Sequence, residues 1–435
     1  MAEFKTVRGM RDFLPEEARL LRHVEGRARE VAKLYGYREI VTPIVESYEL
    51  LSAKAGEEVK SRMFLFKDLG GRDVALRPEF TASVARLVAT TLRNEPRPFR
   101  LFSVGTIYRY DEPQRGRYRE FWQTNYELMG SSRPEADAEI LLLTNSLMQA
   151  AGLKRFAFKV GTIGVLRGIL TQEKLVDNVQ STVMQLMDKK QYEDAFRVVE
   201  SAGVSETCMP TIRKLVELKG SNVLEVVDKV ADLVNGYEKS VAAARNLREI
   251  LGLVLKSRAD VDMTVDAGFA RGLEYYTGMI LEVYVPDLDI ALGGGGRYDR
   301  LIELFGGDPT PAVGIAHGVD RMMLALHEQK AAQKAAGMAE EGRTVLVVPI
   351  KEELRGEALR VSQMLRNAGV SVELEVMGRK MAKAMEDADR RKMSHAIIIG
   401  ERELKEGAVV LRNLAQRAQS TVKIEDVAQT LKSSP

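Results

Sequence analysis

Apolar and polar positions alternate with different periods along the chain, and each change of period marks a new region. The first region predicts a mixture of helices and strands. A helix is predicted over residues 15–36, because a proline and two glutamates favour its first turn. Short strands are predicted at 62–67 and 74–77, followed by a helix from Thr81. Residues 99–130 alternate with period two around a polar loop, which predicts a long antiparallel hairpin.

Helical spacing dominates the middle of the chain, between roughly residues 170 and 256. Few turn signals interrupt it and strand-like alternation is absent, so this stretch is predicted to be a helical insertion. Strand patterns resume at residues 262–266, 279–285 and 290–292, and a last helix ends near Leu326.

The final part of the chain has a third pattern of apolar and polar positions. Residues 329–343 are rich in Ala, Gly and Glu with little apolar periodicity, which is typical of a linker. Beyond them the pattern becomes strand–helix–strand–helix–strand, with strands that are continuously apolar. Such strands predict a small α/β domain whose sheet is covered on both faces.

Composition and charge narrow the class of protein. With 435 residues, 45% hydrophobic and 29% charged, the chain is predicted to be a soluble globular protein of two or three domains. A net charge of +2 means that any nucleic-acid surface must be local. One cysteine, Cys208, excludes an internal disulfide and a cysteine-cluster metal site, and no apolar run could span a bilayer. The four histidines lack metal-ligand spacing, so we expect no metal site of the protein's own. The single cysteine is typical of a reducing compartment, so we expect the protein to be cytoplasmic.

The predicted hairpin carries an unusual set of polar side chains. Its returning strand places Gln123, Asn125 and Glu127 on one face, which suits a floor that hydrogen-bonds a small polar ligand. Arg109 ends the outgoing strand beside a basic loop, and an arginine fork there suits a phosphate. Spacing alone favours the plainer interpretation, an exposed hairpin tip with solvated charges.

Two further stretches could carry chemistry. In the first, Arg271 is followed by Tyr275 and Tyr276, which could wall a pocket for a planar polar ring, although a turn with packed tyrosines fits the spacing better. In the second, four glycines at 293–296 permit close backbone approach to a ligand, and Arg321 lies near the start of a helix, where a phosphate is favoured. A glycine run is often only a flexible loop. Neither a GxxxxGK[ST] phosphate loop nor a GxGxxG turn is present.

Taken together, these stretches resemble the class II aminoacyl-tRNA synthetases in order and spacing. The peptide RGLEYYTG, which starts at Arg271, is similar to a signature of the histidyl-tRNA synthetases, and GRYREFWQ within the hairpin also resembles theirs. LRPEFTASVAR at Leu76–Arg86 is similar to their substrate-binding segment. The stretches that resemble the three class II motifs are residues 35–51, 102–130 and 293–326.

The resemblance covers essentially the whole chain and implies a domain plan. It implies an α+β catalytic domain over residues 1–326, built on a mixed, mainly antiparallel sheet and interrupted by a helical insertion domain at 170–256. A linker at 327–342 would lead to a C-terminal α/β anticodon-binding domain at 343–435. The segment that resembles motif 1 implies a homodimer.

The resemblance also implies the reaction. The chain would activate L-histidine with ATP to form histidyl-adenylate and pyrophosphate, and would then transfer histidine to the 3′ end of tRNA(His). Magnesium would accompany ATP, on the resemblance alone.

Roles for individual residues follow from the resemblance position by position. Arg109 would hold the α-phosphate, Arg321 would hold ATP from the opposite side, and Arg271 would lie beside the reacting phosphate and carboxylate. The loop residues Glu112 and Arg119 would contact ATP or the tRNA acceptor end.

The amino acid would be held by a second set of residues. Glu79 and Thr81, assisted by Gln123, would bind the α-amino group. Glu127 and Tyr276 would read the imidazole, with Tyr275 adjacent.

Two departures from the family pattern affect this transfer of roles. Phe80 stands where many relatives have glycine, and Tyr110-Asp111-Glu112 replaces the commoner His-Glu-Arg, which removes one positive charge from the loop. Two other classes of function are also open. A non-catalytic regulatory paralogue that binds histidine would typically lack the C-terminal domain and the catalytic arginines, both of which are present here. An interaction protein built on the same scaffold could be distinguished only by an activity assay.

Overall fold

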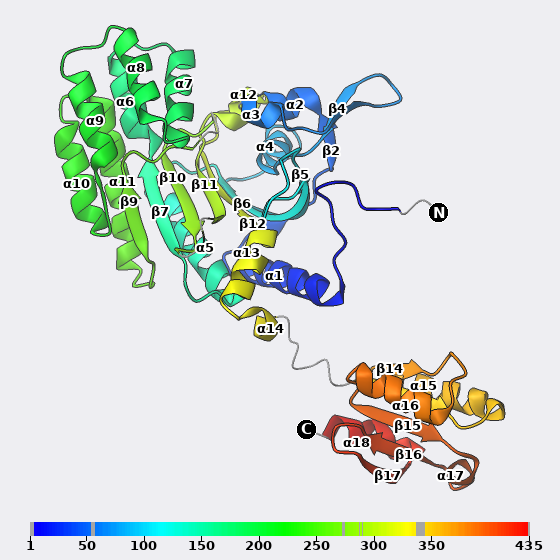
Figure 1. The fold of residues 1–435 in the computed structure, drawn as a ribbon. Helices are drawn as coiled ribbons and strands as arrows, with labels where there is room; N and C mark the ends of the chain where they lie inside the picture. The colour runs from blue at the N-terminus through cyan, green and yellow to red at the C-terminus, as the bar shows by residue number, and fades with distance from the viewer. Residues whose placement is uncertain are drawn as a thin grey trace. The chain divides into compact units, whose positions relative to one another are not determined.

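The structure is a computed structural model that divides into two compact units, Met1–Ala336 and Gly337–Pro435, and each is described by itself (Figure 1). None of the described helices is long and apolar enough to cross a membrane. The structure describes residues 4–53, 57–271, 275–286, 288, 290–335 and 344–433.

A nine-stranded sheet forms the centre of the first unit, in the order β1-β5-β6-β12-β11-β10-β7-β9-β8. Only the β1–β5 and β7–β9 pairs are parallel, so the prediction of a mixed, mainly antiparallel sheet is confirmed. The strands are β1 (Arg38–Glu39), β5 (Phe99–Tyr108), β6 (Glu120–Met129), β7 (Ala157–Thr162), β8 (Lys219–Gly220), β9 (Met263–Asp266), β10 (Met279–Tyr284), β11 (Ala291–Arg297) and β12 (Ala312–Gly318).

Three helices cover one face of this sheet: α1 (Pro15–Leu34), α5 (Pro134–Ala151) and α13 (Val319–Glu328). The predicted first helix is confirmed, with Pro15 at its N-terminus and acidic residues in its first turn. Strand alternation directs Tyr126 towards these helices, where its hydroxyl donates to the carbonyl of Ala28 at 2.8 Å. The neighbouring residues of β6 therefore point to the opposite face, which holds the cavity described below.

A small three-stranded sheet lies beside the main one, in the order β2-β4-β3. The predicted helix from Thr81 is confirmed as α4, and the two predicted short strands are β3 and β4, although β3 begins three residues later than predicted. These elements are β2 (Val45–Ser47), β3 (Leu65–Lys67), β4 (Asp73–Leu76), α2 (Tyr48–Ser52), α3 (Glu57–Lys60), α4 (Thr81–Ala89) and α12 (Leu301–Leu304).

Helices fill the chain between β7 and β9, as the spacing predicts, with one exception. The two-residue strand β8 pairs with β9 within this stretch, and a strand so short leaves no period in the sequence. The helices are α6 (Ile163–Gln172), α7 (Asp177–Asp188), α8 (Tyr192–Ser201), α9 (Cys208–Glu217), α10 (Val223–Leu233) and α11 (Glu238–Lys256).

The stretch predicted to be a linker is helical in part of its described residues. Its start belongs to α13, which ends at Glu328, and a further short helix, α14, spans Ala332–Ala335 with Ala332 buried. The alanine-rich composition that suggested a linker is also a good helix-forming composition, and packing decides between the two. Residues 336–343 lie outside the described part of the chain.

The second unit has a five-stranded sheet in the order β14-β13-β15-β16-β17. The three predicted strands are the parallel ones, whereas the antiparallel pair β16–β17 was not predicted. The elements are β13 (Val345–Pro349), η2 (Glu352–Leu354), α15 (Arg355–Asn367), β14 (Val372–Leu374), α16 (Met381–Arg390), β15 (His395–Ile399), α17 (Glu401–Lys405), β16 (Ala408–Asn413), β17 (Ala418–Lys423), η3 (Ile424–Asp426) and α18 (Val427–Ser433).

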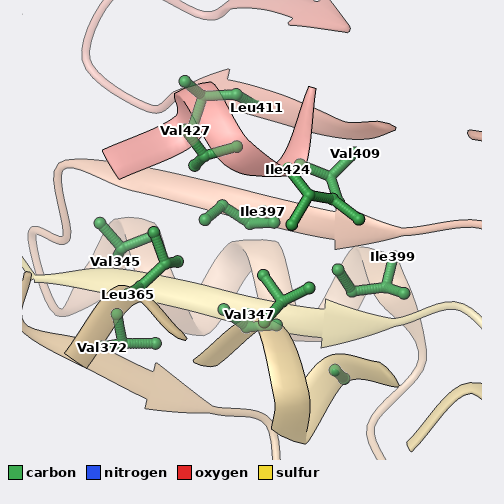
Figure 2. Close-up of a cluster of buried hydrophobic side chains, with 12 residues drawn as sticks. Val345, Val347, Leu365, Val372, Ile397, Ile399, Val409, Leu411, Ile424 and Val427 are labelled. Atoms are coloured by element: carbon green, nitrogen blue, oxygen red, sulfur yellow. The ribbon is translucent and has the colours of Figure 1, made fainter. Parts of the chain in front are cut away.

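Both faces of this sheet are covered, as predicted. Val345 and Val347 point to a core that includes Leu365 of α15 and Val427 of α18 (Figure 2). Alternate residues of the same strand pack on α16 in a second core. The strands are continuously apolar because the side chains on both faces of the sheet are buried.

The buried side chain of Leu365 tests this core. We expect Leu365→Ala to destabilise the second unit by about 2–5 kcal/mol, since it removes the packing of a buried isobutyl group and leaves a cavity. The unfolding transition would be followed by circular dichroism in urea. Leu359→Ala, at an exposed position of the same helix, is the control and should change stability by less than about 0.5 kcal/mol. Equal effects of the two substitutions would contradict the packing described here.

Candidate active site

A polar cavity of about 780 Å³ lies on the open face of the main sheet. Its floor comes from β6, β11 and β12, and its walls come from the chain before α4, the loop between β5 and β6, the start of α13 and the end of α7. The predicted site residues that line it are Glu79, Thr81, Arg109, Gln123, Arg271, Tyr275, Tyr276 and Arg321.

The floor shows why β6 carries polar residues on one face. Gln123 and Asn125 line the cavity, whereas Glu127 lies one step further along the strand and is 1% exposed. Gly314 stands opposite Glu127 on β12, and a Cβ there would overlap the glutamate Oε2. Glycine therefore makes the space in which the carboxyl group is buried.

Three protein groups satisfy the carboxyl group of Glu127. Thr81 Oγ1 donates to it at 2.7 Å, Asn125 Nδ2 at 3.0 Å, and the hydroxyl of Tyr298 also donates. Burial raises the pKa of Glu127 to about 8, although the hydrogen bonds from Thr81 and Asn125 oppose the shift. Glu127 thus lies beneath the floor and does not itself line the cavity.

A second carboxyl group, that of the half-buried Glu79, does line the cavity. The hydroxyl of Tyr275 donates to it at 3.2 Å. Burial raises the pKa of Glu79, and the nearby charge of Arg109 opposes that rise. The rings of Tyr275 and Tyr276 lie 4.9 Å apart, and burial raises the pKa of Tyr276 to about 12, so both remain neutral hydrogen-bonding groups at neutral pH.

Two arginines occupy the part of the cavity near the hairpin loop. Arg109 Nε donates to the carbonyl of Pro78 at 2.8 Å. Arg321 Nη1 donates to the carbonyl of Ala291 at 2.8 Å and Nε to that of Gly116 at 3.3 Å. Burial, with the like charges of nearby arginines, lowers the pKa of Arg321 to about 10, which still leaves it cationic at neutral pH. Backbone carbonyls fix both side chains without neutralising them.

Arg271 lies against the glycine strand on the other side. Its Nη1 donates to Glu282 Oε2 at 3.4 Å, while its buried Nε finds no acceptor among the described residues. A Cβ on Gly294 would overlap this guanidinium. The glycine run is therefore not a flexible loop: it is strand β11, and it brings backbone close to a cation. Gly272, Leu273 and Glu274 of the same motif lie outside the described residues.

The two loop residues with predicted roles lie away from the cavity lining. Arg119 is buried, with its guanidinium 3.6 Å from the ring of Tyr110. Glu112 is 77% exposed and pairs with Arg8 at 2.7 Å. The loop residues that do line the cavity are Asp111, Gly116, Arg117 and Tyr118.

Phe80, at the first departure from the family pattern, does not line the cavity. Its ring is buried beneath the guanidinium of Arg77 at 4.3 Å. That guanidinium is held in turn by the carbonyls of Thr42 at 2.8 Å and Thr106 at 2.9 Å. Phe80 therefore supports the turn that carries Glu79 and does not contact the cavity.

Several cavity residues were not predicted. Asp320, in the first turn of α13, accepts a hydrogen bond from the backbone N–H of Trp122 at 2.7 Å. Glu282 of β10 also lines the cavity, as does Lys189, which follows helix α7 of the insertion. The acidic helix start could have indicated Asp320, but nothing in the sequence indicates that α7 ends at this cavity. Among the described residues, no group of three His, Cys, Asp or Glu side chains could hold a metal ion.

Comparisons with known proteins agree on one family. The family model for histidyl-tRNA synthetase matches residues 9–322, and a model for the anticodon binding domain matches residues 344–434. The histidine–tRNA ligase of Methanocaldococcus jannaschii is 40% identical over 98% of both chains.

Two solved structures share the fold. One is a histidyl-tRNA synthetase from Nostoc sp., with a TM-score of 0.78, 23% identity and 99% of both chains covered. The other, from Bacillus halodurans, is described as an ATP phosphoribosyltransferase regulatory subunit/histidyl-tRNA synthetase. It has a TM-score of 0.75 and 26% identity, with 89% of this chain and 97% of that chain covered.

The raised pKa of Glu127 predicts a dependence of stability on pH. Between about pH 4.5 and 8 the folded chain keeps a proton that the unfolded chain releases, so this group's stabilisation is lost as pH rises through that window. We expect the native chain to lose stability relative to Glu127→Gln by roughly 1 kcal/mol per pH unit there. Urea unfolding followed by the fluorescence of Trp122, the single tryptophan, would measure both proteins. If the free energies of unfolding of the native chain and Glu127→Gln changed in parallel with pH, Glu127 would already be ionised in the fold.

Proposed function

Because the chain belongs to the histidyl-tRNA synthetase family, we propose that its polar cavity is the place where L-histidine and ATP react. The chain accordingly acts as an ATP-dependent histidine–tRNA ligase. In the first step the histidine carboxylate attacks the α-phosphorus of ATP, forming histidyl-adenylate and releasing pyrophosphate. In the second step the 3′-terminal hydroxyl of tRNA(His) attacks the activated carbonyl and releases AMP.

The observation that carries this proposal is the set of three half-buried guanidinium groups that line the cavity. Arg271 has a buried Nε with no acceptor among the described residues, and its contact with the carboxylate of Glu282 is long at 3.4 Å, so its donors are available to a ligand. We assign it to the α-phosphate and the attacking carboxylate. Arg109 is assigned to the α-phosphate and Arg321 to ATP from the opposite side. Negative charge that develops at phosphorus is stabilised by cations that are already in place.

Acceptors at the other end of the cavity suit an ammonium group. Gln123 Oε1 is a buried acceptor with no donor among the described residues. Thr81 donates its hydroxyl proton to Glu127, which leaves its oxygen free to accept. With the carboxylate of Glu79, these groups would bind the α-amino group of histidine.

The paired tyrosines suit the imidazole ring. Tyr276 would contact the ring, and Tyr275 would pack beside it while donating to Glu79. Glu127 would act from beneath, since the groups that it orders, Thr81 and Asn125, line the cavity. A site that hydrogen-bonds its ligand rejects apolar amino acids by about 10⁴-fold, because they would leave its buried groups unpaired.

Other parts of the assignment follow from the remaining surfaces. Magnesium would arrive with ATP as part of the substrate, since phosphate oxygens can supply its ligands.

Exposed Glu112 would meet the tRNA acceptor end, and Arg119 would support the loop from below. The second unit would bind the anticodon, as its family model describes. We place the reaction in the cytoplasm, where the buried thiol of Cys208 would stay reduced.

We also propose that two chains form a homodimer through the region of the small sheet. Large apolar side chains are exposed there, and monomers rarely leave such residues clustered in water. The exposed apolar residues of the small sheet, its turn and the chain that leads into it are Val41, Ile44, Val45, Leu65, Phe66 and Leu69.

A regulatory function without catalysis is the second candidate, because one structural relative is described as a regulatory subunit/histidyl-tRNA synthetase. The three cavity arginines argue against it, since holding histidine alone does not require three half-buried cations.

Arg271→Ala tests the chemistry. We expect it to lower histidine-dependent exchange of pyrophosphate into ATP by at least about 10²-fold, because one fixed cation at the reacting phosphate is lost. The control, Arg248→Ala, removes an exposed ion pair with Asp228 and should leave exchange unchanged. Exchange by Arg271→Ala at the native rate would remove the assignment. If the folded native chain gave no exchange at all, the regulatory candidate would replace the enzyme.

Sedimentation measures the proposed dimer. We expect the native chain to sediment at twice the mass of one chain, and Val41→Asp to shift it to the mass of a single chain because a buried charge would be unpaired at the interface. Leu255→Asp, at an exposed position of α11, should not change the mass. A native chain that sediments as a monomer under active conditions would refute the dimer.

A further inference from the structure

We propose that Arg11 is a positioning residue for the nucleotide, acting through a short segment before α1 that ties the hairpin loop to the start of α13. This segment, residues 9–13, is called the N-terminal strap. The inference rests on the proposed binding of ATP in the cavity, but it concerns residues that neither line the cavity nor belong to its motifs.

The strap holds the returning end of the hairpin loop at its backbone. The N–H of Arg119 donates to the carbonyl of Gly9 at 2.8 Å. Gly9 has a φ of +83°, and a Cβ there would lie 2.6 Å from Arg119 Cγ. Glycine is therefore required both by the backbone conformation and by the close approach of the arginine stem.

Arg11 makes the central contact of the strap. Its guanidinium lies 3.6 Å from the ring centre of Tyr118 and forms an ion pair with Asp320, whose side chain is 2% exposed. Tyr118 and Asp320 both line the cavity, one from the loop and the other from the first turn of α13. One planar cation thus joins two walls of the nucleotide side of the cavity.

The end of the strap is anchored by an aromatic contact. Phe13 meets the ring of Trp122 edge to face at 5.1 Å, and the guanidinium of Arg11 lies 4.4 Å from the ring of Phe13. Trp122 also donates its backbone N–H to Asp320. The strap, β6 and α13 therefore share one set of contacts.

Arg321 shows why this placement matters to ATP. It follows Asp320 directly, and its Nε donates to the carbonyl of Gly116 in the same loop. If the loop or the start of α13 moves, Arg321 and Arg117 lose their common geometry around the phosphates. Without Arg11, the buried carboxylate of Asp320 would keep only backbone donors among the described residues, so the pKa of Asp320, already raised by burial, would rise further.

The test compares Arg11→Ala with a matched variant from the same segment of chain. Arg8 also forms an ion pair with a loop residue, Glu112, but both partners are more than 70% exposed, and exposed pairs contribute little. The KM values for ATP and for histidine would be measured in pyrophosphate exchange without tRNA. ATP binding would be measured separately by calorimetry without histidine.

We expect Arg11→Ala to raise the KM and the Kd for ATP about 10-fold or more, with the KM for histidine within about twofold of native. Arg8→Ala should have the native KM values for ATP and histidine and the native Kd for ATP. Arg11→Lys keeps the charge opposite Asp320 but loses the planar stack on Tyr118. Its KM and Kd for ATP should therefore lie between those of the native chain and Arg11→Ala, and they remain informative if the alanine variant does not fold.

Two results would overturn the inference. An unchanged KM and Kd for ATP in Arg11→Ala would show that the strap does not position the nucleotide. A drop in melting temperature with equal changes for both substrates would show a purely structural role. A native chain that binds ATP but gives no exchange would refute the proposed function instead, and calorimetry would still decide the role of Arg11.

Discussion

Close packing of charged side chains against glycine backbone is the constraint on which the site depends. Strands β11 and β12 carry glycine where neighbouring strands carry side chains, and the vacated space is filled by ionisable groups. Gly294 admits the guanidinium of Arg271, and Gly314 admits the carboxyl group of Glu127. A methyl group at either position would overlap the side chain that is packed there. The sheet can therefore bury a cation and an acid on its open face while its ladder of hydrogen bonds stays intact.

Burying these groups carries a cost that the fold offsets locally. Arg109 and Arg321 are held by backbone carbonyls, which orient them without cancelling their charge. Glu127 receives three hydrogen bonds, and Glu79 receives one from Tyr275 and the field of Arg109. Removing water strengthens each of these interactions. The result is a cavity lined by both fixed cations and acceptors, which matches a substrate pair that carries phosphates and an ammonium group.

Much of the fold followed from periodicity, and the failures have physical causes. The hairpin, the first helix and the parallel strands of the second unit have long apolar patterns, so they were predicted. Strand β8 is two residues long, and the β16–β17 pair is mostly exposed on β17, so neither leaves a clear period. The glycine run at 293–296 could not be predicted as a strand, because glycines give no alternation of apolar and polar side chains. Its strand structure comes from pairing with β10 and β12.

The site was partly accessible from sequence for a similar reason. Alternation on β6 placed Gln123 and Asn125 on the cavity floor, but it could not show that Thr81 and Tyr298 cover Glu127, because those contacts come from distant segments. Likewise, no local signal connects Arg11 with Asp320 across some three hundred residues. Resemblance supplied the roles, whereas only the structure supplied these contacts.

The central claim is that one cavity holds histidine and the α-phosphate together, with Arg271 between them. A crystal structure of the chain with a non-hydrolysable analogue of histidyl-adenylate would test it most directly. The account predicts that the imidazole lies against Tyr275 and Tyr276, the amino group contacts Glu79 and Gln123, and the group replacing the phosphate contacts Arg271 and Arg109. An analogue bound with its ends reversed, or without contact to Arg271, would contradict the account.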